Sequence, residues 1–90
     1  PEERRQWEKT VKAMFTDREG KLDKKGYCNA LNTTRDNMLF TVSELQKAIE
    51  DARRSGDAAA VPGYEVMIER NQTNAGILEK EIKSNGGKVN

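Results

Sequence analysis

A stripe of residues at helical spacing in the middle of the chain most constrains how it folds. Its members advance by three or four positions at every step: Tyr27, Leu31, Thr34, Met38, Val42, Leu45, Ile49 and Ala52. This alternation is the pattern of a coiled coil and keeps side chains on one side of an α-helix. Asp23 is suited to cap the start of that helix, and Ser55-Gly56 is suited to end it. We therefore predict a helix over residues 23–54, about 48 Å long, which needs a neighbour to cover its stripe.

Two other segments carry the same periodicity. Residues 1–16 contain Trp7, Val11, Met14 and Phe15, and residues 62–84 contain Tyr64, Met67, Ile68, Asn71, Ala75, Leu78 and Ile82. Polar breaks that contain glycine separate the segments, and no useful length alternates with the period of a β-strand. We predict a single all-α domain over residues 1–90, an elongated antiparallel three-helix bundle. The alternative is a long helical hairpin of the second and third segments, with the first as a short extra helix.

The core of this bundle is expected to be thin. Leu, Ile, Val and Phe supply 16 of the 90 residues, which lies just under the level of about 20% below which chains tend to be disordered. Disordered chains also carry a large net charge, whereas here 16 basic and 15 acidic residues leave +1. The chain is therefore predicted to fold, and whether it does so without a partner is left open.

The residue types in the chain make catalysis and bound cofactors unexpected. The chain has no histidine and one cysteine, Cys28, which removes histidine acid–base chemistry, most transition-metal sites and the usual base for a thiol nucleophile. We predict no enzyme activity, no metal and no cofactor. The lack of a disulfide framework favours a reducing compartment, so a cytoplasmic location is expected. The longest apolar runs are far too short to span a membrane, so no membrane insertion by this segment is expected.

Charge gives no indication of nucleic-acid binding. The basic pairs Arg4-Arg5, Lys24-Lys25 and Arg53-Arg54 each have acidic neighbours. A nucleic-acid binder usually clusters its basic residues on one face and has a strong positive charge. We interpret these pairs as solvated helix faces and predict no nucleic-acid partner.

Three apolar residues lie off the stripes and are candidates for binding a partner: Leu39, Phe40 and Val66. Phe40 lies two positions from Met38, so it faces roughly the opposite side of its helix. In one reading, Leu39 and Phe40 pack on the first helix as core residues. In the other, these residues form a surface for a partner protein or for self-association.

The stretch from Leu31 to Ala52 (LNTTRDNMLFTVSELQKAIEDA) resembles a known helix. It is similar to the second helix of the N-terminal regulatory domain in Golgi and endosomal syntaxins, a branch of the SNARE proteins. The likeness lies in Leu31, Met38, Phe40 (where the family often has tryptophan) and residues 42–49. The resemblance implies an antiparallel three-helix domain that binds tethering or regulatory proteins. The family's Asp-Pro-Phe start is absent, and its first helix is longer than residues 1–16.

These observations predict a non-catalytic helical module for protein–protein interaction, with the regulatory domain of a SNARE-type trafficking protein as its most specific form. The expected partner is another protein or a second copy, bound through amphipathic helices. The alternative is a small structural or secretion-associated subunit or chaperone that folds fully only on assembly with its partner. The thin core motivates that alternative.

Overall fold

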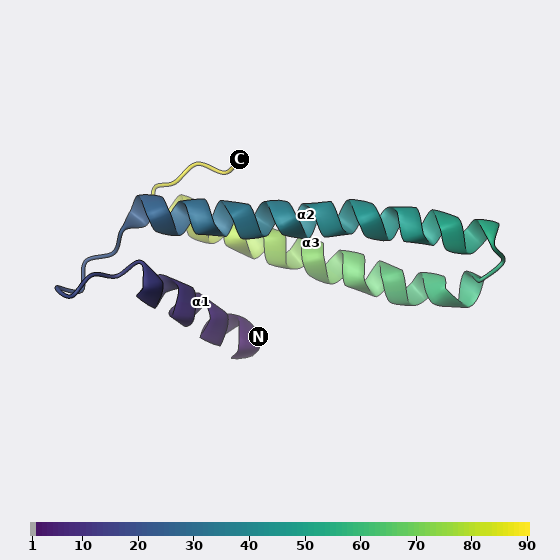
Figure 1. Ribbon diagram of the computed structural model, residues 1–90, viewed down its shortest axis with the longest axis horizontal. Helices are drawn as coiled ribbons and strands as arrows, with labels where there is room; N and C mark the ends of the chain where they lie inside the picture. Colours follow the sequence, from purple (N-terminus) through teal and green to yellow (C-terminus); the bar gives the residue numbers. More distant parts are fainter. Residues whose placement is uncertain (1) are drawn as a thin grey trace.

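The computed structural model describes residues 2–90, which form three α-helices and one short 3-10 helix. The helices are α1 (Glu2–Met14), α2 (Lys24–Arg54), η1 (Ala58–Ala60) and α3 (Val61–Ser84). Helices α2 and α3 pack side by side as an antiparallel hairpin, and α1 lies beside only the half that holds the start of α2 (Figure 1). The molecule measures 58 × 26 × 16 Å. The all-α prediction is confirmed, and the arrangement is a long hairpin with a short extra helix.

The predicted helix limits agree closely with the structure. The predicted start of the first helix, Pro1, lies outside the described residues. The first helix was predicted to end at Thr16 but ends at Met14, because Thr16 instead forms an isolated β-bridge with Leu22. Pro62 lies in the first turn of α3, the helix predicted over residues 62–84. Proline suits that place because its missing N–H has no partner within the helix there.

Side chains and glycines at the helix ends explain where α2 begins and ends. The Asp23 carboxylate accepts a hydrogen bond from the Gly26 N–H at 3.1 Å, as expected of an N-cap. A Cβ on Gly26 would lie 2.9 Å from the Phe15 ring, so glycine lets the turn before α2 approach this helix closely. Gly56 ends α2 with a φ of 80°, and the Asp57 N–H donates to the Ala52 carbonyl at 2.8 Å. This pattern is a Schellman motif.

The core runs along the hairpin in two clusters. The base cluster, near the start of α2, comprises Tyr27, Cys28, Leu31, Leu78 and Ile82. The tip cluster, near the α2–α3 loop, comprises Ile49, Ala52 and Val61. Most stripe positions of α2 and α3 are buried, as predicted. Met14 and Met67 were expected on the stripes but are 74% and 46% exposed, since Phe15 takes the contact with the base cluster in place of Met14 and Met67 lies where no third helix covers α3.

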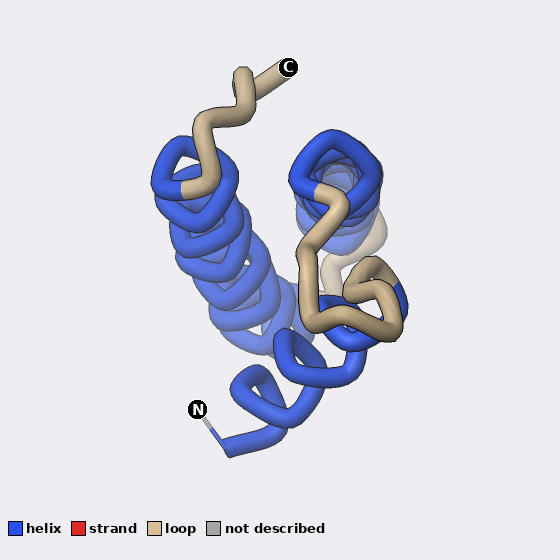
Figure 2. Tube along the Cα trace, turned by 90° about the vertical axis from the view of Figure 1, so that its left-hand side faces the viewer, coloured by secondary structure: helices blue, strands red, loops and turns tan. Residues whose placement is uncertain are grey.

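Helix α1 is attached to the hairpin by partly buried side chains, and none of its residues is fully buried. Trp7, Val11 and the following Phe15 pack against the base cluster. The ring centroids of Phe15 and Tyr27 lie 6.5 Å apart in a tilted arrangement. Seen along the hairpin, α1 crosses the seam between α2 and α3 on one side, while the C-terminal segment lies on the opposite side (Figure 2). The two faces of the hairpin are therefore covered by different segments.

Candidate functional site

The three predicted partner-binding residues are exposed. Leu39 is 38%, Phe40 65% and Val66 47% accessible to solvent. Phe40 is thus not a core residue packed on α1, and that reading is wrong for it. Met38, which belongs to the stripe, packs against the base cluster instead. The prediction that these residues bind a partner stays a prediction.

The structure places these residues on two different surfaces. Val66 lines a groove of about 900 Å³ between α1 and the hairpin, which we call the α1 groove, and neither Leu39 nor Phe40 lines it. Leu39 and Phe40 each follow, by one helical turn, a residue that contacts the C-terminal segment. They therefore lie toward the side of α2 that the C-terminal segment contacts. No single surface unites the three.

The α1 groove has an apolar floor and a charged rim. Its apolar lining residues are Trp7, Met38, Val66 and Leu78, and its charged ones are Glu3, Arg4, Glu69 and Arg70. Among residues 2–90, none of these charged side chains makes an ion pair with another side chain. A groove of this kind binds an apolar surface and orients it by charge.

A polar contact fixes the other end of α1 to the hairpin. The Tyr27 hydroxyl donates to the Glu81 carboxylate at 3.3 Å, and the Lys12 ammonium lies 3.9 Å from the same carboxylate. Burial of the ring, followed by the charge of Glu81, raises the pKa of Tyr27 to about 12. The phenol therefore stays protonated at neutral pH and serves as a hydrogen-bond donor. The arrangement connects α1, α2 and α3.

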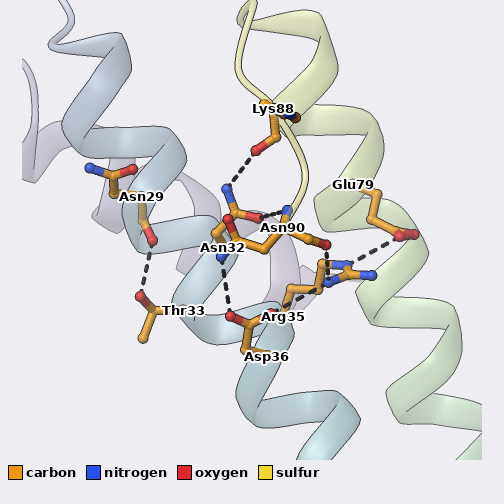
Figure 3. Close-up of polar contacts among 8 residues, drawn as sticks. All are labelled: Asn29, Asn32, Thr33, Arg35, Asp36, Glu79, Lys88 and Asn90. Atoms are coloured by element: carbon orange, nitrogen blue, oxygen red, sulfur yellow. Dashed lines mark hydrogen bonds and ion pairs between the residues drawn. The ribbon is translucent and has the colours of Figure 1, made fainter.

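A second polar site lies on the opposite face, where the C-terminal segment folds back onto α2 (Figure 3). Asn32 is only 5% exposed. Its side-chain N–H donates to the Lys88 carbonyl at 2.9 Å, and its side-chain oxygen accepts from the Asn90 N–H at 3.0 Å. The Arg35 guanidinium donates to the Asn90 backbone oxygen at 3.2 Å and to the Glu79 carboxylate at 3.2 Å. We call residues 86–90 the tail and Asn32, Arg35 and Asp36 the tail site.

Sequence reasoning missed the tail site because its residues lie beside the α2 stripe rather than on it. Cys28, Asn32 and Arg35 follow one another at spacings of four and three, as the stripe does. A second row of that kind, made of a small residue and residues with amide and guanidinium groups, could have indicated a second covered face. The sequence contains nothing that places the tail on that row.

Among residues 2–90, no three acidic, cysteine or histidine side chains gather closely enough to hold a metal ion. No helix in that range is both long enough and apolar enough to cross a bilayer. No family model, no curated protein and no solved structure matches the chain.

Proposed function

We propose that the chain is a non-catalytic interaction module that binds an amphipathic helix of a partner protein in the α1 groove. The supporting observation is that the third-helix position of the bundle is only partly filled. Helix α1 has 13 residues and α2 has 31, which correspond to lengths of about 20 Å and 46 Å. Toward the α2–α3 loop, the seam between α2 and α3 has no helix lying across it (Figure 1).

The residues along this seam fit an apolar helix face. Met38 and Trp7 are half-buried at the groove, and Val66 and the adjacent Met67 are about half exposed. Methionine side chains adapt their shape to different partners. A helix that presents residues at i, i+3/i+4 and i+7 would cover the floor and complete a three-helix cross-section.

The charges on the rim can select the partner helix and set its orientation in the groove. Arg4 and Arg70 provide positive charge, and Glu3 and Glu69 provide negative charge, around one floor. Because they are unpaired among residues 2–90, a partner helix with both charge signs gains contacts without breaking existing ones. Rim charges of this type affect association rate and register more than affinity.

A selection experiment tests this proposal. A library of amphipathic helical peptides is selected against the intact chain, and the recovered peptides are titrated against two variants. Val66→Asp places a charge in the groove and is expected to weaken binding about tenfold or more. Phe40→Asp is the matched control, because Phe40 is at least as exposed but lies outside the groove. Recovered peptides that bind Val66→Asp as well as the wild type would refute the proposal.

A regulatory domain of a SNARE-type trafficking protein in the cytoplasm is the most specific form of the proposal. It rests on the sequence resemblance of residues 31–52 and on the absence of a disulfide framework around Cys28. The partial third helix supports the general form, in which a partner helix completes the bundle.

A further inference from the structure

The tail is held by the same backbone groups that a β-strand uses to bind its neighbour. Asn32 donates to the carbonyl of residue 88 and accepts from the N–H of residue 90 (Figure 3). A carbonyl and an N–H two residues apart are the groups that a parallel strand presents to the strand beside it. The Asn32 amide thus takes the place of a neighbouring strand, and it binds the peptide backbone rather than a side chain.

Residues 87–90 each make a different contact with the hairpin. A Cβ on Gly87 would lie 2.6 Å from the Cys28 sulfur and 2.9 Å from its Cβ, so only glycine fits there. The Lys88 side chain is exposed, and only its carbonyl is bound. Val89 packs against the base cluster. The Asn90 side-chain amide donates to the Asp36 carboxylate at 3.2 Å. The site therefore fits the pattern glycine, any residue, apolar residue, asparagine.

The tail site is built from side chains of α2, and Arg35 is held in it by a contact outside the tail. Asn32 and Arg35 project from the first half of α2, and the Arg35 guanidinium is also held by Glu79 of α3. Helix α3 ends at Ser84, before the tail begins at Gly86. A cleft of about 430 Å³ lies between the start of α2 and the tail, so the tail is not packed tightly on all sides.

From these contacts we propose that Asn32, Arg35 and Asp36 form a binding site for a peptide of this pattern from a partner protein. Residues 87–90 of the chain itself occupy the site when the partner is absent. The tethered tail has a high local concentration, so a partner segment must bind through further contacts or at high concentration to displace it. This site is separate from the α1 groove, and its failure would leave the proposed function untouched.

The single cysteine reports on the tail. Cys28 is 5% exposed and lies beneath Gly87, so its alkylation by iodoacetamide measures how often the tail leaves. Gly87→Ala adds a methyl group that collides with Cys28. Gly87 has no positive φ, so this variant adds no backbone strain there. We expect alkylation to accelerate about tenfold or more with unchanged helix content. Gly76→Ala, whose Cβ would meet no atom, is the matched control and should keep the wild-type rate.

A peptide then tests the site directly. Acetyl-Gly-Lys-Val-Asn-amide at millimolar concentration should slow the alkylation of the Gly87→Ala protein, and the peptide with alanine in the first position should not. Adding Asn32→Ala to the Gly87→Ala protein should abolish protection by the peptide. Equal protection by both peptides, or protection that survives Asn32→Ala, overturns the proposal.

Urea separates release of the tail from unfolding of the whole chain. Alkylation through tail release should be nearly independent of low urea concentrations, whereas alkylation through global unfolding rises steeply with urea. A Gly87→Ala protein with the wild-type rate, or a rate that follows global unfolding in both proteins, also overturns the proposal.

Discussion

Removing the Tyr27 hydroxyl should change the stability of the chain in opposite directions at neutral and at alkaline pH. At neutral pH the hydroxyl donates to Glu81. Tyr27→Phe should therefore cost about 1 kcal/mol, the usual net value of one hydrogen bond. The loss is not larger, because the Glu81 carboxylate keeps a second donor, the Asn85 side-chain amide at 2.9 Å.

The alkaline effect follows from the pKa of the same phenol. Burial and the charge of Glu81 raise the pKa of Tyr27 from 10.0 to about 12. The unfolded chain therefore loses this proton at lower pH than the folded chain. The stabilisation is fully present below pH 10 and is lost as the pH rises toward 12. Two pKa units correspond to about 2.7 kcal/mol, of which about 2.3 kcal/mol is lost by pH 12.

These two effects predict that the stability curves of wild type and Tyr27→Phe cross between about pH 10.5 and 11, where the ionisation cost equals about 1 kcal/mol. The assay is urea unfolding followed by far-ultraviolet circular dichroism from pH 7 to pH 12. Both proteins carry Tyr64→Phe, so that no tyrosine other than Tyr27 titrates in the comparison. All other titrations are shared and cancel in the difference. If Tyr27→Phe remains less stable than its parent at pH 12, the phenol is not buried beside Glu81 and the reasoning fails.

Three further predictions follow from the packing and can be checked by thermal unfolding and sedimentation. Phe40→Ala should change the free energy of unfolding by less than about 0.5 kcal/mol, whereas Ile82→Ala in the base cluster should cost about 2–5 kcal/mol; a large loss for Phe40→Ala would show that it is a core residue. Gly26→Ala should destabilise the chain because its Cβ would collide with Asp23 and Phe15, while Gly76→Ala should be neutral or stabilise it by up to about 1 kcal/mol. Sedimentation with circular dichroism should show a cooperatively folded monomer at micromolar concentration, and helix content that rises with concentration would instead support a subunit that folds on assembly.

Periodicity predicted the hairpin well because both of its helices carry continuous stripes. The ends of α2 were also predictable, since Asp23 and Gly56 determine them through local backbone chemistry. The exposure of Met67 was not predictable, because Met67 continues the α3 stripe. Its exposure depends on how far α1 extends along the seam, which is a property of another segment.

The tail site could not be predicted from the sequence, for a related reason. The tail has no periodicity, and its position depends on distant partners, above all the buried Asn32. An asparagine beside a stripe is usually exposed, and here its burial is made favourable by two backbone groups some 56 to 58 positions away. Tertiary contacts of that kind have no local signature.

The division of the core into a base cluster and a tip cluster has a consequence for how the hairpin opens. The tip cluster buries only Ile49, Ala52 and Val61, and neither α1 nor the tail lies over it (Figure 1). The backbone amides around the α2–α3 loop should therefore exchange with deuterium much faster than those near Leu31 and Ile82. The hairpin should come apart from its loop toward its base, so limited proteolysis should cut first near Gly56.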